Sequence, residues 1–210
     1  MKGESLYNMA PAGLVEYGLE QFYLSLAKYG NLPWGEEPCF YWVHNPDTGW
    51  PSFIFSIRFP YAPQVKDIAE LKLSAEKGIF PDSLVVSDHR SSDLLNLLAH
   101  AGFVPVLSWK GMWCTEEMVN FLPVNEKVRL EETCNTVQAE EFAGVVNEVL
   151  FAAKRISPGL VVTSESAGLW FYRVVFEDRL AGSIALHRIG NLCGIYLVTV
   201  KPEFRRMGIA

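Results

Sequence analysis

The stretch that decides the fold is "VKPEFRRMGIA", residues 200–210, the last eleven of the 210-residue sequence. A strand-like run of aliphatic and β-branched residues, "IYLVTV" (195–200), leads directly into it. Pro202 has no N–H group for strand pairing, so the strand is expected to end there. The sequence therefore predicts a strand followed by a tight turn.

The composition of this turn favours an anion site. Gly208 and Ala210 carry minimal side chains, which lets backbone N–H groups approach a ligand closely. Arg205 and Arg206 add positive charge beside them. Unpaired amides at a helix N-terminus bind anions, and a pyrophosphate group fits such a turn.

Upstream of the turn the pattern predicts a three-stranded meander. Two short connections carry turn chemistry, Glu177-Asp178 and Gly190-Asn191. The predicted strands cover residues 169–177, 180–190 and 193–200, and before them come a strand at 128–132 and a helix at 136–154.

The first half of the chain predicts a second set of elements. The expected helices cover residues 12–30, 62–78 and 91–102, and the expected strands cover 39–45, 52–60, 82–88 and 103–114. The strands at 39–45 and 52–60 read as a hairpin, the breaker-rich residues 31–38 as a loop, and residues 115–127 as a linker.

Composition restricts the class of protein. Half of the residues are hydrophobic and 13% are aromatic, which is enough for a sizeable core. The 24 acidic residues exceed the 18 basic ones, which argues against non-specific binding to nucleic acid or to acidic membranes. No apolar run reaches the roughly 20 residues that span a bilayer, and no secretory signal begins the sequence, so a cytoplasmic protein is expected.

The metal-binding residue types are scattered. The four cysteines, Cys39, Cys114, Cys134 and Cys193, form no C-x-x-C pair, and the four histidines have no ligand spacing. We expect free thiols and no metal.

The order of strand, helix, three antiparallel strands and V-x-P-x-F-R-R-x-G-x-A resembles the Gcn5-related N-acetyltransferase family. The signature of that family is the turn [RQ]-x-x-G-x-[GA], which Arg205, Gly208 and Ala210 match here. The resemblance covers about residues 127–210. It implies an α+β fold, with a mixed, mainly antiparallel sheet flanked by helices.

The resemblance also implies acetyl-CoA as co-substrate and acetyl transfer to a primary amine of a small molecule or peptide by direct attack. It assigns the pantetheine arm to the strand before the turn and the pyrophosphate to the turn itself. These cofactor-binding positions are Leu197, Val198, Thr199, Val200, Arg205, Arg206, Met207, Gly208, Ile209 and Ala210. No catalytic base is assigned, and the candidates are His187, Tyr196 and Glu165.

Two architectures remain open. In the preferred one, residues 1–120 form a degenerate N-terminal domain of the same family without a cofactor turn, in which Gly102-Phe103 matches a recurring "GF". Residues 121–210 then form the first half of an acetyltransferase domain, truncated inside its turn. In the other, the first half packs against the meander, within one chain or exchanged between two.

The alternative function is that of a non-catalytic fragment or remnant that serves as an interaction module. An open, apolar sheet edge would tend to pair with another copy, so a homodimer is a further expectation. No nucleic-acid or membrane partner is expected.

Overall fold

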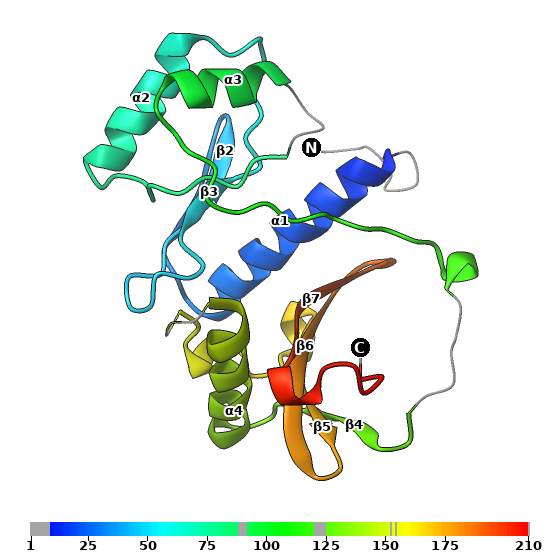
Figure 1. Ribbon diagram of the computed structural model, residues 1–210. Helices are drawn as coiled ribbons and strands as arrows, with labels where there is room; N and C mark the ends of the chain where they lie inside the picture. Colours follow the sequence, from blue (N-terminus) through cyan, green and yellow to red (C-terminus); the bar gives the residue numbers. More distant parts are fainter. Residues whose placement is uncertain (1–8, 88–91, 120–124, 152, 154, 210) are drawn as a thin grey trace.

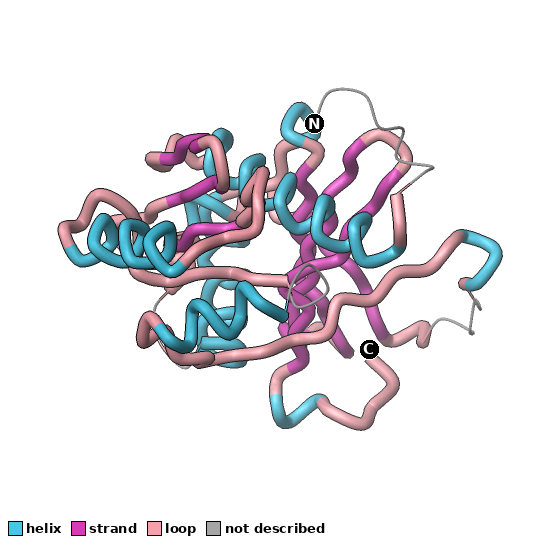
Figure 2. Tube along the Cα trace, turned by 90° about the horizontal axis from the view of Figure 1, so that it is seen from above, coloured by secondary structure: helices cyan, strands magenta, loops and turns pink. Residues whose placement is uncertain are grey.

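The computed structural model describes residues 9–87, 92–119, 125–151, 153 and 155–209. Figure 1 shows these residues arranged as two sheets with helices packed against them. Figure 2 shows the long strands of the second sheet from above. This is the predicted α+β class with antiparallel sheets flanked by helices, so the fold class is confirmed.

The larger sheet is the predicted meander with one added strand. It has the order β4-β5-β6-β7, and every neighbouring pair is antiparallel. Its strands are β4 (Val128–Glu132), β5 (Leu169–Phe176), β6 (Arg179–Ile189) and β7 (Leu192–Val200). The predicted turn between β5 and β6 is confirmed, because Glu177 and Asp178 both have positive φ angles, 46° and 62°. Two successive left-handed residues are what a tight hairpin needs to match the strand twist.

The smaller sheet comes from the first half of the chain and has the antiparallel order β1-β2-β3. Its strands are β1 (Trp34–Glu37), β2 (Phe40–Val43) and β3 (Phe53–Phe55). The predicted hairpin is thus confirmed, but β1 lies where a loop was expected. At Gly35 a Cβ atom would come within 2.6 Å of the Trp42 indole, so glycine lets the ring lie across β1 where the two strands pair.

The helices follow the predicted order. They are α1 (Pro11–Tyr29), α2 (Val65–Glu76), α3 (Ser92–His100) and α4 (Thr136–Val146). The last ends earlier than expected, because the chain continues as a π-helical turn over Asn147–Phe151. No helix within the described ranges is long and apolar enough to cross a membrane.

Two predicted strands of the first half were wrong. Residues 103–114 form no strand, although their alternating apolar residues favour one, because no neighbouring strand offers them hydrogen bonds. Of the strand expected at 82–88, the described residues form only one isolated bridge, between Leu84 and Ile54. Propensity alone therefore did not decide pairing.

Helix α1 packs against the larger sheet as well as against the first half of the chain, to which it belongs. Phe22 is 1% exposed, and its ring stacks on Tyr196 of β7 with centroids 4.0 Å apart. The same cluster of buried side chains includes Phe53 of β3, Phe142 of α4 and Phe171 of β5. One core therefore receives side chains from both sides of residue 120, and the division into two domains at that point remains a prediction.

A buried polar contact accompanies this packing. His187 of β6 is 2% exposed, and its Nε2 atom lies 3.0 Å from Oγ of Ser25 on α1. Its Nδ1 atom is buried without a hydrogen-bond partner among the described residues. Because burial disfavours the charged imidazolium, the pKa of His187 is lowered to about 4.

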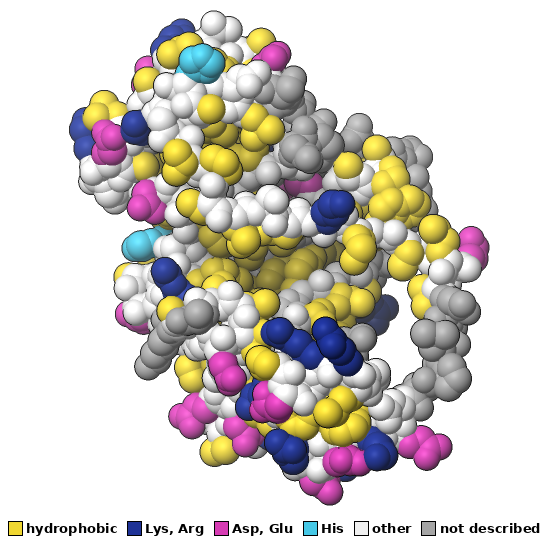
Figure 3. Space-filling view, in the orientation of Figure 1, with side chains coloured by type: hydrophobic (Ala, Val, Ile, Leu, Met, Phe, Trp, Pro, Cys, Tyr) yellow, Lys and Arg dark blue, Asp and Glu magenta, His cyan; other side chains and the backbone are white. Residues whose placement is uncertain are grey.

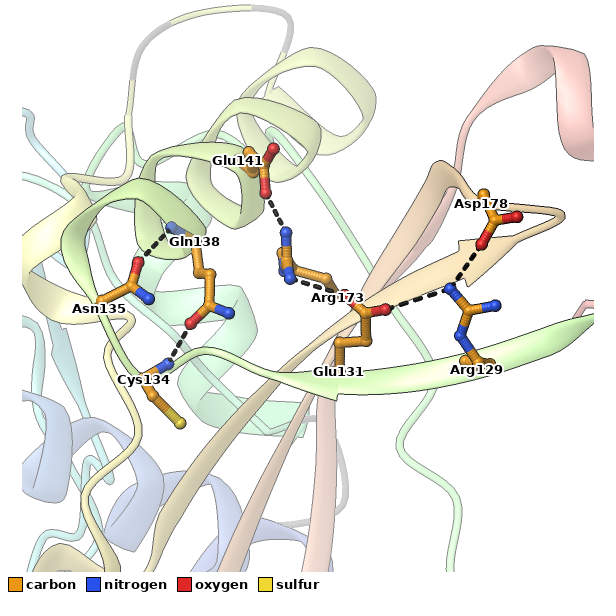
Figure 4. Close-up of polar contacts among 8 residues, drawn as sticks. All are labelled: Arg129, Glu131, Cys134, Asn135, Gln138, Glu141, Arg173 and Asp178. Carbon is orange, nitrogen blue, oxygen red and sulfur yellow. Dashed lines mark hydrogen bonds and ion pairs between the residues drawn. The ribbon is translucent and has the colours of Figure 1, made fainter.

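An ion-pair network joins the larger sheet to α4, on the face of the sheet that α4 covers (Figure 4). Arg173 of β5 is 14% exposed in its side chain and pairs with Glu131 of β4 and with Glu141 of α4. At the start of α4, the Asn135 side chain accepts a hydrogen bond from the backbone N–H of Gln138, 3.1 Å away. This cap fixes where the helix begins.

The first prediction concerns the aromatic stack. Phe22→Ala should lower the free energy of unfolding by about 3 to 5 kcal/mol, because it leaves a cavity between α1 and the larger sheet. Denaturant unfolding measures the change. Val137→Ala is the control, since Val137 is 66% exposed on α4 and should change stability by less than about 0.5 kcal/mol. A loss for Phe22→Ala as small as that of the control would contradict the packing.

The second prediction concerns pH. The folded pKa of His187 is about 4 and its ordinary value is 6.5, so between these values the unfolded chain binds more protons than the folded one. The free energy of unfolding should therefore fall by on the order of 2 kcal/mol as pH drops from 6.5 to 4. Urea unfolding across this range, compared with His187→Gln, isolates the contribution. A variant whose pH profile matches that of the wild type would rule out His187 as the source.

Candidate functional site

Strand β7 is an open edge of the larger sheet. It pairs with β6 on one side, and no other described strand pairs with it on the other. Ile195 and Val198 are 62% and 47% exposed. Backbone groups along such an edge are available to an extended ligand or another strand.

A bulge interrupts β7 just before the turn. Ser183 pairs with Thr199, and Ala185 pairs with Tyr196, so β7 places one more residue between these pairs than β6 does. Leu197, in the bulge, has a positive φ angle of 51°, which is unusual for a residue with a side chain. A bulge bends the strand and redirects its backbone groups.

Buried hydroxyl groups hold the bulge in place. The Ser183 hydroxyl lies 3.0 Å from the Leu197 carbonyl oxygen, to which it donates, and 2.7 Å from the Thr199 hydroxyl. Both side chains are nearly fully buried, at 0% and 3% exposure for the residues. Ser183 was not among the predicted site residues, and no sequence motif marks it.

The turn after β7 is anchored from beneath. Pro202–Phe204 forms a single 3-10 turn, which confirms that the strand ends before Pro202. The Phe204 side chain is 4% exposed and packs with Phe176 and Ala181. From the segment before β4, the Asn125 amide donates to the Met207 carbonyl oxygen, 3.2 Å away. These contacts fix the loop without occupying its outer surface.

The outer surface of the turn carries the arginines. Arg205 uses its Nε–H to reach the Val200 carbonyl oxygen at 3.3 Å. Arg206 is exposed with a φ of 65°, and its guanidinium has no hydrogen bond or ion pair with any described residue. Gly208 also has a left-handed φ of 66°, and no atom lies within 4 Å of where its Cβ would be. Ala210 lies outside the described residues.

A small open cavity of about 150 Å³ lies at this turn. Its lining comprises Val200, Phe204, Arg205, Arg206, Gly208 and Ile209. It is therefore lined by the glycine and both arginines of the predicted anion site. A guanidinium with no partner among the described residues, beside open space at Gly208, is an arrangement that can accept an anion.

The three candidate catalytic residues are not gathered at one point. His187 and Tyr196 both contact the Phe22 ring, at centroid distances of 5.9 and 4.0 Å. Both face α1 rather than the turn. Burial raises the pKa of the Tyr196 hydroxyl, so this group stays protonated at neutral pH. Glu165 is exposed, in a short turn before β5 (Glu165–Ala167), and is not grouped with them by any contact found among the described residues.

Within the described ranges, no group of three or more His, Cys, Asp or Glu side chains is arranged to hold a metal ion. All four cysteines are free thiols, three of them exposed.

Comparisons with known proteins bear on the fold. The chain is similar to the solved structure of a GCN5-related N-acetyltransferase from Kribbella flavida, with a TM-score of 0.65 and 11% sequence identity over 96% of this chain and 77% of that one. No family model matches the chain, and no curated protein matches it in sequence. At this level of identity the likeness establishes the architecture, so the chain has a GNAT-like fold.

Proposed function

We propose that this chain is an acyltransferase-type protein that binds acetyl-CoA along β7 and its following turn and transfers acetyl groups to a primary amine. The observation that carries the proposal is the order of three features along β7 and the turn that follows it. The open edge of β7, the bulge at Leu197 and the arginine-glycine turn lie in this order. An extended, phosphate-bearing thioester matches that order.

In the proposed complex, the backbone of residues 197–200 pairs with the pantetheine arm. Backbone amides and the arginines of residues 205–210 hold the pyrophosphate. The bulge turns backbone groups of β7 away from β6, so that they can meet a ligand instead of a strand. Acetyl-CoA, when bound, supplies an activated acyl carbonyl to the attacking amine.

The residues of the chain would position the reactants and move protons. Orientation of the amine beside the thioester lowers the barrier by removing the entropic cost of encounter. Among the three candidates, Tyr196 is the one on the strand that enters the turn. A phenol that stays protonated can donate to a thiolate leaving group, and we propose this role for it. Tyr196 also contacts α1 but is only half-buried, whereas His187 is 2% exposed, so substrate access to His187 would require α1 to move.

Cofactor binding tests the proposal directly. Gly208→Glu should lower the affinity for coenzyme A at least about tenfold, because a carboxylate would enter the open space of the turn and repel phosphate. Isothermal titration with acetyl-CoA measures this. Gly78→Glu is a matched control, since Gly78 also has a left-handed φ, 70°, with no atom within 4 Å of its Cβ position.

Equal affinities of the two glycine variants and the wild type would remove the turn from the binding site. If the wild-type protein does not bind acetyl-CoA, the result would instead support the alternative function, in which the chain is a non-catalytic interaction module.

The proposed proton donor has its own test. Tyr196→Phe should reduce turnover about tenfold or more while leaving acetyl-CoA affinity unchanged, because the ring and its stack on Phe22 remain. Release of free coenzyme A thiol, measured with a panel of primary amines, gives the turnover. Full turnover in the variant would exclude the hydroxyl from the reaction.

A further inference from the structure

The strongest unexplained feature is a long apolar segment on the surface. Between α3 and β4, eight large hydrophobic side chains are 41% to 90% exposed: Val104, Val106, Leu107, Trp109, Met112, Trp113, Met118 and Val119. We call residues 104–119 the apolar segment. Figure 1 shows it crossing α1 and then extending away from the rest of the protein as far as the short helical turn at Glu116–Met118. Soluble monomers rarely expose so much contiguous apolar surface.

The larger sheet has a matching feature on one face. Successive residues of a strand point to opposite faces, and α1 and α4 cover the face that carries Phe171, Ala185 and Tyr196. On the other face, Trp170 pairs with Leu186, and Leu186 pairs with Ile195. With Tyr172 and Ile184 these residues form what we call the open face, and none of the five belongs to a described core cluster.

The apolar segment leaves the β7 side of the open face exposed, whereas Trp170, Tyr172, Ile184 and Leu186 of that face are half-buried. Ile195 stays 62% exposed and Trp109 55% exposed. Figure 3 shows hydrophobic side chains gathered on this view of the molecule, near the upper part of the outer arm and on the body beside it. Each chain therefore presents both an apolar extended segment and an apolar sheet face.

We propose that the apolar segment of one chain docks on the open face of a second copy, and that the exchange is reciprocal. In such a dimer the apolar segment of each chain contacts the open face of the other, and a two-fold axis relates the two contacts. The assembly is then closed at two chains, because neither chain has an apolar segment or an open face left unpaired. The eight exposed side chains of the apolar segment offer on the order of 800 Å², if a fully exposed aromatic side chain presents about 150 to 250 Å² and the aliphatic ones somewhat less. This equals the roughly 800 Å² per partner of a standard stable interface.

The chemistry of the two surfaces also suits this occupant. The apolar segment contains three charged residues, Lys110 and, near its end, Glu116 and Glu117, and the β7 strand contains none. A partner with charged residues throughout the contact would have to desolvate them, whereas a second copy presents mainly apolar side chains to both surfaces, with the exposed Arg188 opposite Cys193 on the open face. The proposal does not depend on cofactor binding.

The oligomeric state tests the proposal. Multi-angle light scattering and sedimentation equilibrium of the full chain should give the mass of two chains as concentration rises. The double variant Val106→Glu with Trp109→Glu should raise the dimer dissociation constant at least about tenfold, and Ile195→Glu should do the same from the other surface. Both sites are exposed, so circular dichroism should show folding unchanged.

Val137→Glu is the control, because Val137, at 66%, is exposed to nearly the same extent as Ile195, at 62%, but lies on α4 and outside both surfaces. It should dimerise as the wild type does. Wild-type protein that stays monomeric at every concentration would overturn the proposal, as would segment and face variants that dimerise like the control.

Two native thiols distinguish exchange between chains from closure within one. Cys114 lies in the apolar segment, and Cys193 is exposed on β7 two residues before Ile195, hence on the open face. In a background of Cys39→Ser and Cys134→Ser, a chain with Cys114→Ser is mixed with a chain with Cys193→Ser, and a short bismaleimide is added.

A covalent dimer linking the two different chains is expected. If the chain that retains both thiols gives only an internally linked monomer, the apolar segment closes on its own sheet and the proposed exchange is wrong.

Discussion

The packing of α1 across β6 and β7 is the constraint on which the rest of the structure depends. The Phe22 ring lies on Tyr196 at 4.0 Å, and Ser25 meets His187 at 3.0 Å. These contacts join the first half of the chain to the sheet that carries the candidate site. Because protein interiors are close-packed, a displacement of α1 would also displace the side chains of β7 that pack against it.

This arrangement divides the larger sheet into two faces with different environments. One face is buried under α1 and α4 and is tied by Arg173 to Glu131 and Glu141. The other carries Trp170, Leu186 and Ile195 in register, and none of these three residues belongs to a described core cluster. The edge strand β7 stands between the two, with a bulge held by Ser183. The proposed ligand uses the edge, whereas the proposed second copy uses the open face.

The proposed chemistry places modest demands on the chain. Acyl transfer by direct attack needs positioning and proton movement more than it needs a nucleophilic side chain. The turn supplies, at Arg206, a guanidinium without a partner among the described residues, and free space at Gly208. Tyr196 supplies a phenol whose pKa is raised by burial. A residue that deprotonates the amine is not among the positions we assign.

The sequence by itself determined the meander, its Glu177-Asp178 turn and the end of β7 at Pro202, because these depend on alternation and on backbone limits of single residues. It also determined the composition of the turn. Tertiary structure alone decided that residues 103–114 form no strand, that Gly35 lies in one, and that β7 bulges at Leu197. Strand pairing and bulges depend on partners distant in sequence, and the burial of His187 depends on where α1 packs, so no local pattern encodes them.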